Sequence, residues 1–150
     1  MIQFDAIIPW LNYLVSGTGM TLSLAFFSAT FGLLIAIMVN YLRHRQILNR
    51  LLYVYIDLFR GTPLLLQLSM MYYAIPRLLS GLINTLFGLD LMFQLSPFQA
   101  AIITFSLNSG AYVSEIIRSG IGSIPKGEIE AAESLGVSKG HIFKDILMPV

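Results

Sequence analysis

The chain has 150 residues, of which 56% are hydrophobic and only 11% charged, and its mean hydropathy is +0.76. A soluble domain carries roughly 25% charged residues, so this composition excludes an ordinary soluble domain and predicts an all-α integral membrane protein. The net charge of +1 indicates no particular partner, and the absence of Cys from the sequence excludes a disulfide framework and thiolate metal sites.

The first apolar stretch carries no charged residue from Ala6 to Leu42, which is longer than one span needs. Small and polar residues interrupt it as far as Gly19, so we predict an extracytoplasmic segment over residues 1–17 and a first span over about 18–39. That span measures about 33 Å, enough to cross a hydrocarbon core of about 30 Å. Basic residues follow at once and predict a cytoplasmic end, which leaves the N-terminus outside: Arg43, His44, Arg45 and Arg50.

The second apolar stretch must extend to both sides of Gly61 and Pro63 to reach the roughly 20 residues of a span, so we predict a span over about 52–75. Pro63 lacks a backbone N–H and disfavours a helical residue before it, which predicts a kink. The same span brings Asp57 and Arg60 to the cytoplasmic boundary, where a spacing of i,i+3 predicts an ion pair.

The stretch from residue 77 to residue 96 mixes apolar and polar side chains. Its apolar residues recur at helical spacing and predict a short helix lying in the outer interface: Leu79, Leu82, Ile83 and Leu86. A span here would instead export the basic residues further along the chain, against the positive-inside bias. We therefore predict the third span over about 97–117, which returns the chain to the cytoplasm.

Both the first and the third span carry a small residue at every fourth position: Ser28, Gly32 and Ala36, and Ser106, Gly110 and Ser114. Small residues let helix backbones approach closely in lipid. The pattern is compatible with packing of the two spans against each other and with a seam between two copies of the chain.

The third span also places polar side chains on one face, at Asn108, Tyr112 and Glu115. Polar groups inside a membrane are costly and usually face a cavity or a partner, so these residues and Arg118 are candidates to line a pathway. The alternative is structural, because Glu115 and Arg118 stand at i,i+3 and can form a simple ion pair.

The cytoplasmic segment 126–149 has the outline of two short helices. Glu128–Leu135 predicts the first helix, Gly136 stands just beyond its end, and Ser138 can cap a second helix that Pro149 stops. The two helices carry more apolar surface than they can bury alone, which predicts a protein partner in the cytoplasm. DNA is not the expected partner, because the segment carries as many acidic as basic residues.

The spacing of residue types in this segment resembles the EAA loop of permease subunits of ABC importers. The matching positions are Glu130, Ala131, Ala132, Gly136, Ile146 and Pro149, with Met148 where Leu is usual. The stretches from Arg60 to Gln67 and from Ser96 to Arg118 are similar to the polar amino-acid subfamily. This resemblance covers nearly the whole chain from about Gly17.

The resemblance implies a type I importer transmembrane fold of five spans in the cytoplasmic membrane, three of which are expected in this chain. It implies a homo- or heterodimer of permeases that imports polar amino acids by alternating access. Two ATPase subunits would bind the EAA loops, and an extracytoplasmic solute-binding protein would deliver the amino acid. The six EAA positions given above would couple the permease to the ATPase. The chain itself would be no enzyme and would hold no cofactor or metal, since ATP and Mg belong to the ATPase.

The family continues for two spans beyond the EAA loop, whereas this chain ends at Val150. We expect either a fragment or a C-terminally truncated product, and in the second case no transport. The main alternative function is a small channel or membrane assembly module with a docking helix pair. A membrane enzyme is less favoured, because His44 and His141 show no metal-ligand spacing. The sequence leaves open which amino acid is carried and whether the second permease copy is identical.

Overall fold

The computed structural model describes residues 8–43 and 45–147, and all the regular elements in these residues are helices. The all-α prediction is therefore confirmed for this part of the chain. The elements, with η marking π-helical turns, are α1 (Ile8–Leu42), α2 (Gln46–Gly61), α3 (Leu64–Ser69), η2 (Met70–Ala74), α4 (Ile75–Phe87), α5 (Pro97–Ser123), α6 (Lys126–Ser134), α7 (Lys139–His141) and η3 (Ile142–Leu147).

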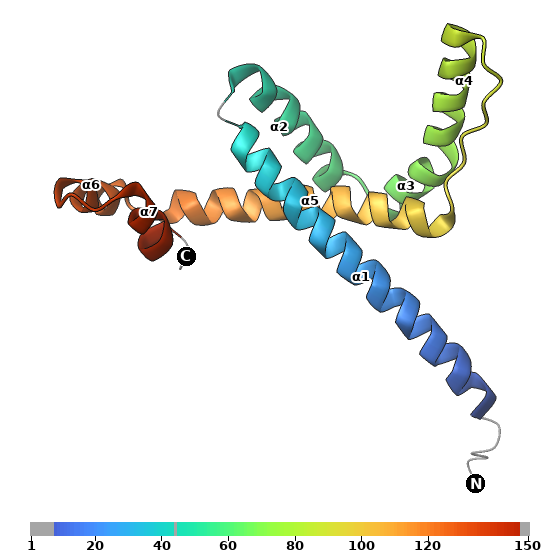
Figure 1. Cartoon of the computed structure of the whole chain (residues 1–150), viewed down its shortest axis with the longest axis horizontal. Coiled ribbons are helices and arrows are strands. Elements are labelled where there is room, and N and C mark those ends of the chain that lie inside the picture. The colour runs from blue at the N-terminus through green and yellow to red at the C-terminus, as the bar shows by residue number, and fades with distance from the viewer. Residues whose placement is uncertain (1–7, 44, 148–150) are drawn as a thin grey trace.

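Two of these helices are long and apolar enough to cross a membrane within the described residues, Tyr13–Leu42 in α1 and Pro97–Ser123, which is α5. The C-terminal half of α1 crosses the middle of α5 (Figure 1). The helix α1 begins at Ile8, ten residues before the predicted start of the first span. The small and polar residues there do not interrupt it, because their hydroxyl groups donate to carbonyls of the preceding turn, as Thr18 does to Leu14 and Thr21 to Gly17.

The helices α1 and α5 are held together by the small residues predicted to pack. A Cβ atom added to Gly32 would lie 2.8 Å from the Cβ of Ser109, and one added to Gly110 would lie 2.7 Å from Cγ2 of Ile35. Real Cβ atoms essentially never come this close, so only glycine fits at the two positions. Ser28, Ala36, Ser106 and Ser114 are buried along the same contact. The small residues therefore serve packing within the chain.

The predicted second span is divided between two helices rather than kinked. The helix α2 ends at Gly61, Thr62 is extended with φ −117° and ψ 147°, and Pro63 starts the next helix with ψ 134°. The segment from α2 to η2 runs antiparallel to α5, since Tyr55 bonds to the carbonyl of Leu107 near the middle of α5, while Tyr72 shares a pocket with Pro97 at its start.

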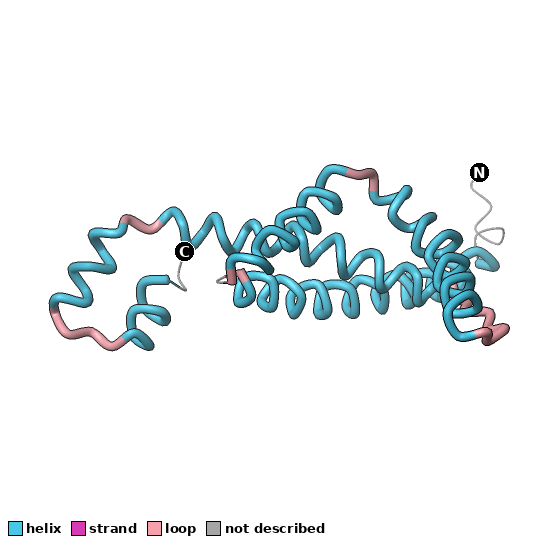
Figure 2. The backbone as a smooth tube through the Cα atoms, turned by 90° about the horizontal axis from the view of Figure 1, so that it is seen from above, coloured by secondary structure: helices cyan, strands magenta, loops and turns pink. Residues whose placement is uncertain are grey.

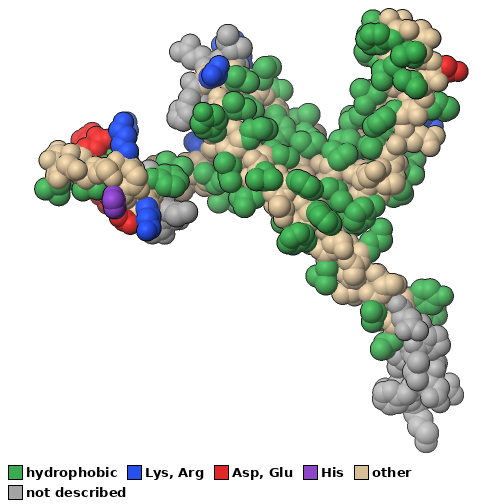
Figure 3. Space-filling model, in the orientation of Figure 1, with side chains coloured by type: hydrophobic (Ala, Val, Ile, Leu, Met, Phe, Trp, Pro, Cys, Tyr) green, Lys and Arg blue, Asp and Glu red, His purple; other side chains and the backbone are tan. Residues whose placement is uncertain are grey.

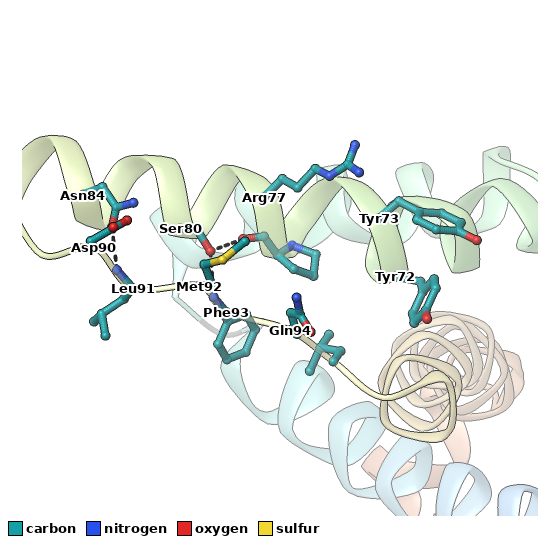
Figure 4. A pocket seen from close by; sticks show the side chains of 12 residues that line it. Tyr72, Tyr73, Arg77, Ser80, Asn84, Asp90, Leu91, Met92, Phe93 and Gln94 are labelled. Atoms are coloured by element: carbon teal, nitrogen blue, oxygen red, sulfur yellow. Dashed lines mark hydrogen bonds between the residues drawn. The ribbon is translucent and has the colours of Figure 1, made fainter.

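The helix α4 is a rigid hairpin with the loop that follows it. It ends at Gly88, whose φ of 65° is left-handed, and the loop then returns along the helix. The backbone N–H of Leu91 donates to Oδ1 of Asn84 (2.9 Å), and that of Phe93 donates to Oγ of Ser80 (2.8 Å), as Figure 4 shows for the first bond. A pocket of about 540 Å³ lies between helix and loop.

The helices α4 and α6 lie toward opposite ends of the long axis of the molecule. Both views place the N-terminal end of α1 and the helix α4 at one end, and α6, α7 and η3 at the other, with α4 running crosswise to α5 (Figures 1 and 2). With 13 residues, α4 measures about 20 Å and is too short to span a membrane. Its position in the outer interface stays a prediction.

The buried apolar core is small. It centres on Val39, Ile56 and Ala111, where α1, α2 and α5 meet. Most large apolar side chains are exposed instead, and Figure 3 shows them over α1, α2, α4 and α5, while charged side chains gather on α6, α7 and the start of α2. Exposed apolar surface on long helices is expected where lipid replaces water as the solvent.

Candidate functional site

The terminal helix pair, defined as α6 with α7 and η3, is built around Gly136. The N–H of Gly136 donates to the carbonyl of Glu133 (3.0 Å), and the N–H of Val137 donates to that of Ala132 (3.1 Å). These two bonds form the Schellman motif, which needs a left-handed residue, and the φ of Gly136 is 75°. Ser138 then caps the second helix, where its hydroxyl accepts from the N–H of His141. The turn predicted at Gly136 and Ser138 is therefore present.

The terminal helix pair exposes apolar side chains to its surroundings. Leu135 is 83% exposed and Phe143 is 55% exposed, while Ala132 and Ile142 are buried where α6 packs on η3. Glu130 and Ala131 are exposed. We expected Ala131 and Ala132 both to face a partner, but Ala132 packs inside the pair.

The last two residues predicted to couple to the ATPase lie at the end of the terminal helix pair and beyond it. Ile146 lies in the backbone of η3, and Pro149 lies outside the described residues. The pair joins α5 through Ile124 and Pro125 alone. The terminal helix pair therefore follows α5 after a very short connection.

Asn108 of α5 lies at the break between α2 and α3. Its Nδ2 donates to the carbonyl of Phe59 and to Oε1 of Gln67, both at 3.1 Å. The side chain of Gln67 in turn donates to the carbonyls of Phe59 (2.9 Å) and Thr62 (3.0 Å). A helix end leaves carbonyls without partners, and these two amides supply the missing donors. Gln67 was not among the residues predicted for the site, although a lone amide within an apolar run is a usable signal.

Tyr112 lies one turn beyond Asn108 on α5 and contacts the last turn of α2. Its hydroxyl donates to the carbonyl of Arg60 (3.4 Å), and the Arg60 guanidinium lies over its ring, 5.4 Å from the centroid. The predicted pair of Asp57 with Arg60 is therefore wrong, because Arg60 turns toward α5. Among the described residues the ion pairs involve Arg43, Glu115 and Arg118 only.

Glu115 is the centre of a charged cluster in the C-terminal third of α5. One carboxylate oxygen accepts from Arg43 at the end of α1, and the other accepts from Nε of Arg118 at 2.9 Å. The side chains of Arg43 and Glu115 are 10% and 14% exposed, whereas that of Arg118 is 52% exposed. Arg43 also stacks on Tyr53, 5.0 Å from the ring centroid. The structure thus joins α1, α2 and α5 through a pair that the sequence analysis did not foresee.

Asn40 adds a second polar link between the same two long helices. Its Nδ2 donates to the carbonyls of Ala36 and of Ser114, both at 3.0 Å. Within the described part of the chain, no three His, Asp or Glu side chains lie close enough to hold a metal ion. Asn40 ties the C-terminal end of α1 to the backbone of α5.

The described residues form an all-helical subunit with two helices long and apolar enough to cross a membrane and the terminal helix pair at one end. Residues 7–150 match the family described as binding-protein-dependent transport system inner membrane component. The chain belongs to this family.

Named relatives agree with this membership. The chain is 40% identical to the arginine transport system permease protein ArtQ of Bacillus subtilis (strain 168), over 99% of this chain and 63% of that protein. It is 34% identical to the glutamine transport system permease protein GlnP of Escherichia coli (strain K12), over 99% of this chain and 64% of that protein.

A solved structure described as an amino acid ABC transporter with histidines is similar, with a TM-score of 0.75 and 30% identity. The similarity covers 99% of this chain and 64% of that one. The chain thus spans a little under two thirds of the length of these relatives.

Proposed function

We propose that this chain is the membrane-spanning part of an ATP-driven importer of polar amino acids, coupled to ATPase subunits through the terminal helix pair. The relatives named above are permeases for arginine and glutamine, which supports this substrate class. ATP hydrolysis then belongs to the ATPase, and this chain holds neither ATP nor Mg.

The observation that carries the proposal is the exposed apolar surface of the terminal helix pair. Leu135 and Phe143 project from two short helices that are rigidly joined at Gly136. Exposed apolar side chains on a polar, lipid-free segment are the usual mark of a protein interface. The surface is charged as well as apolar, with Glu130 exposed on α6, so a partner can be selected by both shape and charge.

The charge distribution supports an orientation with the terminal helix pair in the cytoplasm. Basic residues occur at the ends of α1 and α5 that adjoin the pair and in the pair itself, whereas Arg77 is the basic residue of the α4 hairpin. The positive-inside bias then leaves the start of α1 outside. An external solute-binding protein would approach the α4 end, and a second permease copy would complete the pathway by alternating access.

The four residues predicted to line the solute pathway fall into two groups, exposed and hydrogen-bonded. Tyr112 and Arg118 are exposed and remain candidates to line a path for the solute. The amide of Asn108 bonds to the helix break, and the carboxylate of Glu115 bonds to Arg43 and Arg118. We therefore propose that these two residues stabilise the helices around the path.

Co-purification with an ATPase tests the proposal. Tagged chain extracted in mild detergent is expected to retain an ATP-binding subunit, identified by mass spectrometry. Glu130→Lys and Gly136→Leu should abolish this association, because the first reverses an exposed charge and the second cannot adopt the left-handed turn. Matched controls in α6 are Glu128→Lys and Gly127→Ala, which should retain the ATPase. Retention by all four variants would refute the proposed docking surface.

A further inference from the structure

The groove beside Tyr112 is lined by residues of α2 and α5 and lies near the middle of α5. The helix α5 has 27 residues, and Tyr112 lies 15 residues from Pro97 and 11 from Ser123. At about 1.5 Å per residue, Tyr112 is within about 3 Å of the middle of α5. Because the Arg60 guanidinium lies over the Tyr112 ring, it stands beside the middle of α5, one of the two described helices long and apolar enough to cross a membrane.

An exposed arginine at this depth cannot remain in contact with lipid tails. Charged side chains within membranes face a water-filled cavity or a partner, and they mark the paths of ions and substrates. Arg60 is exposed in the structure, and in the described residues it makes no ion pair with a carboxylate. The guanidinium contacts the Tyr112 ring, and the backbone carbonyl of Arg60 accepts from the Tyr112 hydroxyl.

The groove itself has the size and charge of a site for a small anion. It has a volume of about 350 Å³, and its lining residues are Arg60, Tyr112, Glu115, Ile116, Arg118 and Ser119. Both oxygens of Glu115 are already bonded to arginines, so the charge left for a ligand in the groove is positive. Volumes near this value are typical of sites for small molecules.

The stacking of Arg60 on Tyr112 selects among anions. The ring attracts the guanidinium, whose carbon lies 5.4 Å from the ring centroid, without using its N–H donors. These donors form a planar fork that matches the two oxygens of a carboxylate. Asp57 lies one helical turn before Arg60 and is exposed, so a group able to take an ammonium is on the same face of α2.

We propose that Arg60 is the receptor for the carboxylate of the transported solute, in the groove between α2 and α5. This assignment rests on the proposed import of amino acids. It moves Arg60 from the membrane boundary, where its spacing from Asp57 had placed it, to the solute path.

Nuclear magnetic resonance of the whole chain tests the assignment. The chain is labelled with ¹⁵N-arginine in detergent micelles, and Arg60→Lys identifies the Nε–H signal of Arg60. L-glutamine and N-acetyl-L-glutamine, which both carry a carboxylate, should shift this signal saturably. L-glutaminamide, which lacks the carboxylate, should not. The signal of Arg77 on α4 serves as the internal control and should stay in place with each probe.

Equilibrium binding of radiolabelled L-glutamine provides the second measurement. Arg60→Gln is expected to weaken binding at least tenfold, and Arg77→Gln is expected to leave it unchanged. If Arg60→Gln does not fold, the magnetic-resonance experiment with the three probes on the unaltered chain decides the question.

Four results would overturn the assignment: no response of Arg60 to any probe, an equal response to L-glutaminamide, an equal response to inorganic phosphate, or a response only to phosphatidylglycerol added to the micelles. The last would make Arg60 a receptor for lipid headgroups. If the ATPase still co-purifies, such a result removes this inference and leaves the proposed function standing.

Discussion

The contact between Gly110 and Ile35 allows a direct test of how α1 and α5 are held together. In Gly110→Ala the added Cβ would lie 2.7 Å from Cγ2 and 3.0 Å from Cβ of Ile35, and 3.2 Å from the hydroxyl of Tyr55. The Cβ of Ile35 is fixed to its backbone and cannot rotate away. The two helices must therefore move apart to accept a single methyl group.

The size of the effect follows from two opposing contributions. Overpacking a closely packed contact costs about 1–3 kcal/mol. Replacing glycine by alanine within a helix otherwise stabilises it by up to about 1 kcal/mol. Gly120 lies in the same helix with nothing within 4 Å of an added Cβ, so Gly120→Ala isolates the second contribution. We expect Gly110→Ala to be less stable than Gly120→Ala by about 1–3 kcal/mol, and Gly120→Ala itself to be neutral or stabilising.

Fluorescence energy transfer across the helix pair measures these differences. The sequence contains no Cys, so dyes can be attached uniquely to cysteines introduced at the exposed positions Ile37 and Ile116. Unfolding is then followed in mixed micelles of increasing sodium dodecyl sulfate. Ile35→Ala should partly rescue Gly110→Ala, with a coupling of about 0.5–3 kcal/mol. Equal stabilities of Gly110→Ala and Gly120→Ala, or strictly additive effects with Ile35→Ala, would refute the close-packing argument.

Three further predictions use the same unfolding measurement or hydrogen exchange. Asn108→Ala removes a donor from the break and should cost about 1–3 kcal/mol, because an amide oxygen of α3 loses its partner. Glu115→Gln leaves the guanidinium of Arg43 buried without its counter-charge and should cost about 3–5 kcal/mol. Arg118 is exposed, so Arg118→Gln should cost at most about 1 kcal/mol. Gly136→Ala forces a left-handed alanine and should raise amide exchange at the end of α6 by the equivalent of about 1–2 kcal/mol. Gly127→Ala should leave that exchange unchanged. Similar losses for the two charge variants, or unchanged exchange in Gly136→Ala, would contradict these expectations.

The sequence was sufficient where structure depends on local chemistry. Gly136 and Ser138 predicted the turn of the terminal helix pair, because the residue types of a helix end are set by its own backbone bonds. The small residues at every fourth position around Gly32 and around Gly110 likewise predicted close helix packing, since few other patterns permit it in lipid.

The sequence did not predict contacts between residues that lie far apart in the chain. Asp57 and Arg60 have the spacing of a helical ion pair, yet the break after α2 turns Arg60 toward Tyr112, 52 residues away. Glu115 was assigned one arginine because the rule for i,i+3 pairs considers a single helix. Its second partner, Arg43, arrives only when α1 crosses α5.

The two kinds of contact along α5 suggest where the molecule can change shape. The contact with α1 is a seam of glycine and serine with no spare room, so α1 and α5 are expected to move as one body. The contact with α2 and α3 combines the apolar packing of Ile56 against Ala111 with side-chain hydrogen bonds of Asn108 and Tyr112 at the helix break. Hydrogen bonds of this kind can exchange partners with water, whereas interlocked backbones cannot slide. A displacement of the terminal helix pair passes into α5 through Ile124 and Pro125, and it should therefore alter the groove at Arg60 before it separates the two long helices.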